Sequence, residues 1–144
     1  MSRDRVDWDR YFMGIARAVA SRSTCPRRSV GAVLVQGRDI RGTGYNGAPA
    51  GVESCDEVGC LMRDDHCIRA IHAEANLLLR TDARDREGAT VYVTVRPCWA
   101  CANLLANAGI ASVVHEEEYW RDSGGVRALL AAAGVSMHYL DEEA

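Results

Sequence analysis

The sequence contains no apolar run near the roughly 20 residues needed to cross a bilayer. Its first ten residues, MSRDRVDWDR, are charged where a secretory signal would be apolar. Positive charge is not in excess either, because the formal net charge is −3 and the pI is about 5.8. A broad nucleic-acid surface is normally basic, although a few local arginines can still hold a small anion. We therefore expect a cytoplasmic protein that binds neither membranes nor nucleic acid.

Linkers, low-complexity tracts and internal repeats are also absent. The 144 residues suffice for one ordinary domain and are too few for two, so we predict a single domain over residues 1–144. Apolar residues make up 48% of the chain, which is enough for a packed core. The six cysteines of a cytoplasmic protein are better explained as metal ligands or reactive thiols than as disulfides.

The hydrophobic pattern predicts helices that alternate with strands. Helical spacing begins after Asp7, a suitable N-cap, and predicts a helix over about residues 7–22. An apolar run over residues 30–35 predicts a strand buried on both faces, and Gly37 a turn into a strand over 39–45. A helix after residue 67 should bury Ile71, Ala75, Leu78 and Leu79. Further strands are expected over residues 90–95, 111–115 and 135–139, and further helices over residues 99–108 and 126–133. Because helices separate the later strands, we predict a three-layer α/β/α fold around a mixed five-stranded sheet.

Two short motifs carry the chemistry. His72-Ala73-Glu74 is followed, after a predicted strand, by P-C-W-A-C at residues 97–101, and this combination is the signature of zinc-dependent deaminases. Cys98 and Cys101 are three residues apart, which puts both sulfurs on one face of a helix's first turn, where the helix end favours the thiolate. His72 would supply a third zinc ligand and leave the fourth tetrahedral position for water, whose pKa falls near 7 in favourable zinc sites.

Glu74 is placed to move protons. Residues two apart on a helix point about 200° apart, so His72 and Glu74 can converge only on a metal that lies off the helix's N-terminal end. There Glu74 would take a proton from the water and deliver it to the ring nitrogen and then to the leaving ammonia. A lone C-x-x-C could instead be a redox pair or half of a structural zinc knuckle, but the two motifs together favour an enzyme.

Beyond these motifs, the chain resembles the deoxycytidylate (dCMP) deaminases, especially a bacterial branch of the cytidine/deoxycytidylate deaminase superfamily. The resemblance runs from about Trp8 to Tyr119 and comprises WDRYFM, RSTCPRRSVGAVLV, GYNGAPAG, CDEVGCLMRDDHCIRAIHAEAN and EGATVYVTVRPCWAC. It implies one catalytic zinc and hydrolysis of dCMP to dUMP and ammonia, in which zinc-bound hydroxide attacks C4 and the product feeds dTMP synthesis. It also implies a homo-oligomer, a hexamer or a dimer, activated by dCTP with Mg²⁺ and inhibited by dTTP.

The resemblance further implies contacts to the nucleoside. Asn46 matches an asparagine that contacts the sugar, although Asn46-Gly47 is also an ordinary turn pair. Ala73 would offer backbone groups to the base, because its side chain forms no hydrogen bond. Trp99 is a departure from the family pattern, since a large indole between the two cysteines could wall the base pocket or pack at a subunit contact.

A phosphate subsite is expected from cationic and amide donors. Tyr119 matches a tyrosine near the nucleotide phosphate in the family, with core packing as its alternative role. Arg27 is the first candidate to bind the phosphate, and Arg28 and Arg121 are further candidates. Any of these arginines could also be a solvated surface residue.

Four cysteines remain outside the catalytic motif. Cys55, Cys60 and Cys67 lie in a long predicted loop over about residues 46–67, and Cys25 precedes it. Some members of the family carry a second, structural zinc in this region, which implies Cys25, Cys55 and Cys60 as ligands together with either Cys67 or His66. Buried free thiols are the alternative.

Other functions remain open on the sequence. The same two motifs occur in deaminases of cytidine, guanine and tRNA adenosine, although a tRNA enzyme should be basic around its site. A non-catalytic zinc module that assembles partners is a different class of protein, and it would have no need of Glu74.

Overall fold

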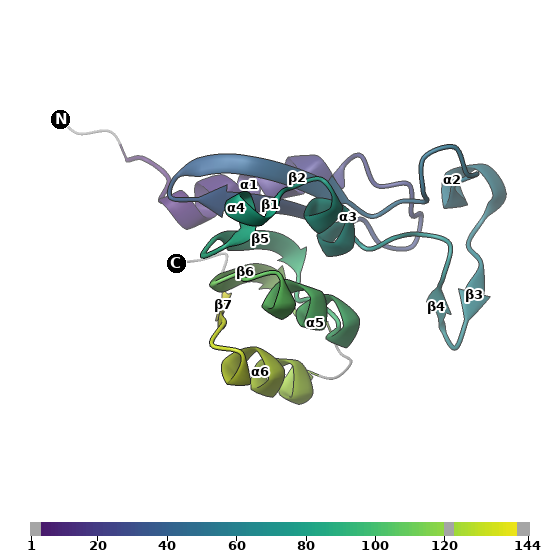
Figure 1. Cartoon of the computed structure of the whole chain (residues 1–144). Coiled ribbons are helices and arrows are strands. Elements are labelled where there is room, and N and C mark those ends of the chain that lie inside the picture. The colour runs from purple at the N-terminus through teal and green to yellow at the C-terminus, as the bar shows by residue number, and fades with distance from the viewer. Residues whose placement is uncertain (1–3, 120–122, 141–144) are drawn as a thin grey trace.

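The computed structural model describes residues 4–119 and 123–140, which form a five-stranded sheet with helices on both faces (Figure 1). The strand order is β2-β1-β5-β6-β7, with β1 at Gly31–Gln36, β2 at Asp39–Tyr45, β5 at Thr90–Val95, β6 at Ser112–Glu117 and β7 at Ser136–Tyr139. β1 is antiparallel to β2 and β5, whereas β5, β6 and β7 are mutually parallel. The predicted mixed five-stranded α/β fold is therefore confirmed.

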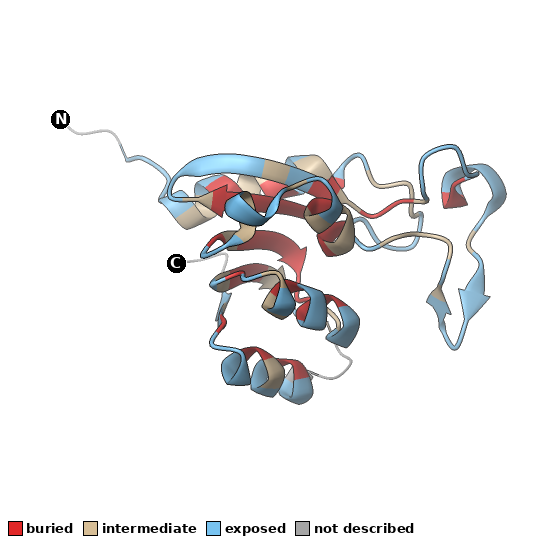
Figure 2. Cartoon of the chain, in the orientation of Figure 1, coloured by how far each residue is buried: buried red, intermediate tan, exposed pale blue. Residues whose placement is uncertain are grey.

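Each face of the sheet has its own apolar core (Figure 2). Helix α1 (Trp8–Ala20) covers one face, where Phe12 and Met13 pack against Val33 and Val35 of β1. Helices α3 (Ala73–Leu79), α5 (Trp99–Asn107) and α6 (Ser123–Ala132) cover the other, and a short α4 spans Ala83–Arg86. β1 is thus buried on both sides, as its continuous apolar run predicts.

Glycines let α3 approach the sheet closely. A Cβ atom on Gly44 of β2 would lie 2.5 Å from both the Ala73 carbonyl oxygen and the Leu77 nitrogen. The helix backbone therefore rests directly on β2, and the end of α3 that follows His72 lies at the end of that strand. Gly31 plays the same part for α1, since its Cβ would lie 2.1 Å from the Ala16 carbonyl oxygen.

The predicted buried face of α3 is wrong. The helix buries Ala73, Glu74 and Leu77, while Leu79 is 76% exposed. Ile71 precedes the helix, and Ala75 and Leu78 are only partly buried, so none of the expected residues is part of the fully buried face. The physical reason is the close contact between Gly44 of β2 and the backbone of α3. This contact determines which face of α3 is buried, because a helix of 7 residues is too short for its hydrophobic pattern to define a face.

Residues 46–72 are more structured than the predicted loop. They include α2 (Cys55–Val58) and a hairpin of β3 (Met62–Arg63) and β4 (His66–Cys67), which turns at Asp64 and Asp65 with φ of 51° and 67°. This arm extends away from the sheet and is mostly exposed (Figures 1 and 2). Between residues 51 and 70 only Ser54 and Cys55 are buried, so apolar packing does little to hold it. Among the described residues, no helix has the length and apolarity to span a membrane.

Candidate active site and metal centres

A cavity of about 290 Å³ opens where several loops meet at one end of the sheet. Its wall includes Asn46 after β2, His72, Ala73 and Glu74 at the start of α3, and Cys98 at the start of α5. The remaining lining comes from residues 25–30, from 65–70 in the arm, and from Val95, Arg96 and Tyr119. The two sequence motifs therefore meet in one place.

Three side chains that can bind a metal, His72, Cys98 and Cys101, lie close together, and two of them line this cavity. His72 is the N-cap of α3 and Cys98 is the N-cap of α5, with Cys101 in the first turn of α5. The His72 Nδ1 atom lies 3.4 Å from the Cys98 sulfur and 3.3 Å from the Cys101 sulfur. Tetrahedral zinc with its usual Zn–N and Zn–S bonds requires an N–S separation of about 3.5 Å, so the donor set fits zinc. The metal would lie off the helix ends, as the spacing of His72 and Glu74 predicts.

The protonation of these groups suits a metal site. A hydrogen bond from the Cys101 thiol, assisted by one from His72, lowers the pKa of Cys98 to about 4. The same pairing with Cys98, together with burial, raises the pKa of Cys101, which donates that hydrogen. Cys98 is therefore a thiolate at neutral pH, which is the form that binds metal.

Glu74 lies in the first turn of α3 and is only 4% exposed. Burial raises the pKa of its carboxyl to about 7. A carboxyl with this pKa exchanges a proton readily near neutral pH, which is the property required of a general acid–base group. Like His72, Glu74 lies on the cavity wall.

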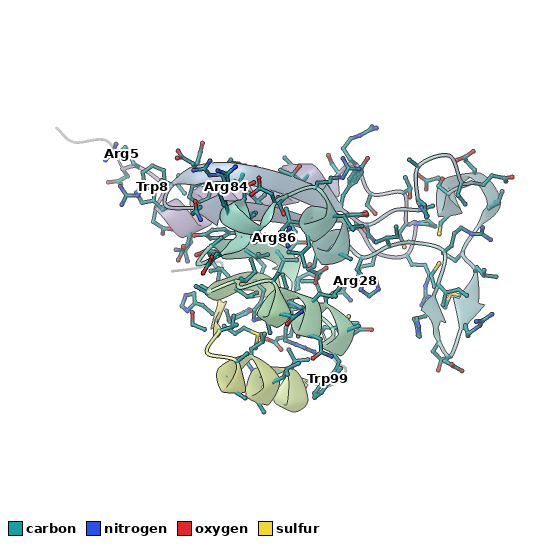
Figure 3. All side chains as sticks on the ribbon, viewed as in Figure 1. Arg5, Trp8, Arg28, Arg84, Arg86 and Trp99 are labelled. Carbon is teal, nitrogen blue, oxygen red and sulfur yellow. The ribbon has the colours of Figure 1, made fainter. Side chains whose placement is uncertain are left out.

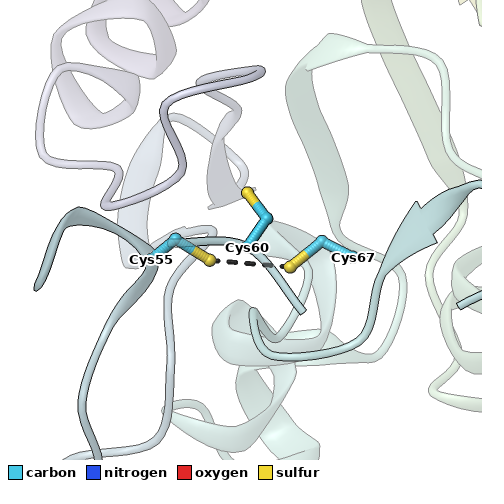
Figure 4. Close-up of side chains that lie close together, drawn as sticks. All are labelled: Cys55, Cys60 and Cys67. Carbon is cyan, nitrogen blue, oxygen red and sulfur yellow. Dashed lines mark hydrogen bonds between the residues drawn. The ribbon is translucent and has the colours of Figure 1, made fainter. Parts of the chain in front are cut away.

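A second cysteine group lies in the arm. The ligand atoms of Cys55, Cys60 and Cys67 are all within 4.8 Å of one another, and the sulfurs of Cys55 and Cys67 are 3.5 Å apart (Figure 4). Two thiolates on a tetrahedral zinc are separated by about 3.8 Å, so this set also fits zinc. Burial opposes ionisation of Cys67, but backbone N–H groups, including those of Arg69 and Ala70, lower its pKa to about 7.

The structure does not bring Cys25 or His66 into this three-cysteine group. Cys25 lies on the cavity wall with Cys67. Burial is the main cause that raises the pKa of Cys60, and repulsion from the Cys25 sulfur adds a small contribution. His66 also lines the cavity, and its Nδ1 lies 3.2 Å from the carbonyl oxygen of Asp64. Both residues therefore stay near the group without completing it.

Asn46 is 8% exposed, and its amide is held by the preceding loop. Its Oδ1 accepts a hydrogen bond from the Val30 N–H at 2.9 Å, and its Nδ2 donates to the Arg28 carbonyl at 2.8 Å. The amide thus has a structural task and faces the cavity as well. Ala73 is fully buried on the same wall, next to His72.

Three of the candidate phosphate residues are part of the cavity wall. Arg27, Arg28 and Tyr119 all line the cavity. The Arg27 Nη1 donates to the Met62 sulfur at 2.9 Å, and the Arg28 guanidinium forms an ion pair with Glu117 at 2.8 Å. Arg121 lies outside the described residues.

Trp99 is not part of the cavity wall as far as the described residues define it. It is 45% exposed at the start of α5 and lies next to α6 (Figure 3). A Cβ atom on Gly125 would lie 2.8 Å from the Trp99 Cζ3 atom, so the indole packs against the backbone of α6. This position shapes the α5–α6 contact and not the cavity.

Arg96 is a charged residue of the cavity wall that sequence reasoning missed. Arg96 is only 1% exposed, between the end of β5 and Pro97. Its Nη1 donates to the Pro97 carbonyl at 2.8 Å, and its Nε lies 3.5 Å from a carboxylate oxygen of Glu118. The only signal in the sequence is an arginine at the end of an apolar strand directly before the cysteine motif.

The comparisons with known proteins agree with this geometry. The family described as "Cytidine and deoxycytidylate deaminase zinc-binding region" matches residues 6–117. The deoxycytidylate deaminase of Mycobacterium phage D29 is 51% identical over 128 residues, which cover 79% of this chain and 98% of that protein. ComE operon protein 2 of Bacillus subtilis is 41% identical over 140 residues, covering 96% and 74%. The crystal structure of the cyanophage S-TIM5 dCMP deaminase with dCMP and dUMP superposes with a TM-score of 0.80 at 26% identity, covering 96% and 100%.

Proposed function

The chain belongs to the cytidine and deoxycytidylate deaminase family, and from this premise we propose that it hydrolyses dCMP to dUMP and ammonia. The observation that carries the proposal is the convergence of His72, Cys98 and Cys101 beside the buried carboxyl of Glu74 in one cavity. Relatives that are named deoxycytidylate deaminases support the choice of substrate. We further propose that residues 1–144 are one deaminase domain.

His72, Cys98 and Cys101 would hold the catalytic zinc through one nitrogen and two sulfurs. When bound, the metal supplies hydroxide at neutral pH by lowering the pKa of water. The approach of His72 to the two sulfurs supports this assignment.

Glu74 would move the protons of the reaction. It takes a proton from the attacking water and transfers it to the ring nitrogen next to C4. It then takes the second proton from the new hydroxyl group on C4 and delivers it to the amino group, which leaves as ammonia when the C4–N bond breaks. The water oxygen becomes the new carbonyl oxygen of dUMP. Burial keeps Glu74 away from solvent while this occurs, and its pKa of about 7 suits both directions of transfer.

The other side chains would orient the nucleotide. We assign Asn46 to the sugar, the backbone of Ala73 to the base, and Tyr119 with Arg27 to the phosphate, because all four line the cavity. An anion on Arg27 would replace its weak contact with the Met62 sulfur by charge-assisted hydrogen bonds.

Cys55, Cys60 and Cys67 would hold a second, structural zinc, with Cys25 or His66 as the fourth ligand. The small buried area of the arm supports this role, because a metal can organise a segment that lacks an apolar core. A homo-oligomer, either a hexamer or a dimer, with dCTP and Mg²⁺ as activator and dTTP as inhibitor belongs to the same proposal and rests on the family resemblance.

A parallel assay tests the substrate assignment. Purified protein is given dCMP, CMP, deoxycytidine, dCTP or cytosine, with and without dCTP and Mg²⁺ as effector, and released ammonia is measured. The proposal predicts the highest kcat/KM for dCMP. A preference for unphosphorylated deoxycytidine would overturn the proposed substrate, and activity only on guanine or tRNA adenosine would point to another branch of the superfamily.

A further inference from the structure

Arg96 is a charged side chain that is fully buried beside the proposed active site. It directly follows β5 and lies two residues before Cys98. A guanidinium has five N–H donors, and burying it is costly unless they meet acceptors. The partners of this one side chain therefore show what it is arranged to hold.

Those partners lie on two separate segments. Nη1 donates to the carbonyl of Pro97 at 2.8 Å, which belongs to the turn that leads into α5. Nη2 donates to the carbonyl of Tyr119, and Nε lies 3.5 Å from the Glu118 carboxylate. The backbone N–H of Arg96 adds a hydrogen bond to the Glu117 carbonyl at 2.7 Å. Arg96 thus joins the cysteine turn to residues 117–119.

The ring of Tyr119 is held as well as its backbone. The Arg96 Cζ atom lies 5.7 Å from the ring centroid, within the range of a cation–π interaction. Tyr119 is half-buried and lines the cavity, as does Arg28, which forms an ion pair with Glu117. Tyr119, which follows β6, therefore contributes to the cavity wall, and the buried guanidinium of Arg96 holds its backbone carbonyl.

We propose that Arg96 is a positioning residue that holds residues 117–119 against the cavity, so that Tyr119 is in place to receive the substrate. This inference rests on the proposed deamination of dCMP. The guanidinium donates hydrogen bonds to the carbonyls of Pro97 and Tyr119, so we expect it to act on substrate binding through Tyr119. Its loss should therefore weaken substrate binding more than it slows the chemical step.

Arg96→Lys is the sharpest substitution. Lysine keeps the positive charge, but its compact ammonium cannot span two carbonyls and a carboxylate as the planar guanidinium does. We expect KM for dCMP to rise about tenfold, equivalent to about 1.4 kcal/mol, with kcat changed less than about threefold and zinc content unchanged. Arg127→Gln is the matched control, since Arg127 pairs with the same Glu118 at 3.0 Å but is half exposed on α6; it should behave like the wild type.

A double-mutant cycle tests the route of the effect. If Arg96 acts through Tyr119, the Tyr119→Ala background should abolish the KM effect of Arg96→Lys. Additive effects would overturn the proposal. So would a fall in kcat with loss of zinc at unchanged KM, because that result would assign Arg96 to the cysteine turn alone. Should Arg96→Lys fail to fold, Glu118→Gln enters the same cycle, with a smaller KM rise that Tyr119→Ala must also abolish.

Hydrogen exchange on the substrate-free protein provides a measurement independent of activity. Arg96→Lys should speed amide exchange in peptides that end at Tyr119, whereas Arg127→Gln should not. Unchanged exchange would overturn the positioning role even if dCMP is the substrate. A wild type that does not deaminate dCMP would instead overturn the proposed function, so the two failures are distinguishable.

Discussion

Gly44→Ala should disturb the proposed active site, because Gly44 of β2 lies against the backbone of α3. The new Cβ would lie 2.5 Å from the Ala73 oxygen and the Leu77 nitrogen, whereas ordinary contact begins at 3.4 Å, so helix and strand must separate by about 0.9 Å (3.4 − 2.5). Both atoms belong to the backbone and cannot rotate away. We expect a loss of about 1–3 kcal/mol in the free energy of unfolding, or about 2–12 °C in Tm for a chain of this size.

The same displacement should impair catalysis, because His72 immediately precedes Ala73 while its partner sulfurs belong to α5. A misplacement near 1 Å can cost about 100-fold in rate, so we expect kcat/KM to fall about 10–100-fold. Gly42→Ala is the matched control on the same strand face, since its Cβ would meet the Thr81 Cγ2 atom at 2.5 Å, near the other end of α3. Thermal unfolding and steady-state kinetics measure both variants. An active, stable Gly44→Ala protein, or equal damage from Gly42→Ala, would refute the reasoning.

Three further experiments probe other parts of the molecule. Wild-type protein should contain two zinc ions per chain by elemental analysis and the Cys55→Ser/Cys60→Ser variant one; a single zinc in the wild type would contradict the second site. Asn46→Asp should lower the free energy of unfolding by about 1–3 kcal/mol in denaturant titrations, because a carboxylate would replace the N–H that meets a backbone carbonyl; unchanged stability would show that this hydrogen bond is dispensable. Leu105→Ala should cost about 2–5 kcal/mol by the same titration, whereas Leu104→Ala, at an adjacent 47% exposed position, should change it by about 0.5 kcal/mol or less; equal losses would contradict the assigned burial.

The sheet could be predicted closely from the sequence because its strands are bounded by strong local signals. β2 and β5 begin and end at the predicted residues, and Gly37 adopts the left-handed conformation expected of the turn between β1 and β2, with φ of 64°. α5 ends before Gly109, whose φ is 86°. Local rules suffice at these points, since each depends on residues that are neighbours along the chain.

Features that depend on distant contacts could not be predicted in the same way. The buried face of α3 is set by Gly44 on another element, and the hairpin after α2 has too few apolar residues to give a strand pattern. The spacing of the cysteines also does not reveal that Cys25 and His66 lie outside the group formed by Cys55, Cys60 and Cys67. Arg96 was missed because its hydrogen-bond partners are backbone carbonyls, which have no signature in a sequence.

The meeting of the two motifs could be predicted, because the spacing itself constrains the geometry. His72 and Glu74 lie two residues apart, which excludes a shared lateral face and places the metal off the helix end. The structure has His72 as the N-cap of α3 and Glu74 in its first turn, as this argument requires. The zinc and proton-transfer roles of these residues stay predictions.

Glu74→Gln tests the central claim most directly. The substitution keeps the size of the side chain and removes its ability to take and give a proton, so ammonia release from dCMP should fall by about 10²–10⁴-fold. Zinc content and thermal stability are measured on the same preparations and should match the wild type. Deamination of dCMP by Glu74→Gln at a rate close to that of the wild type would contradict the account, as would a zinc-loaded wild type that releases no ammonia from any cytosine nucleotide.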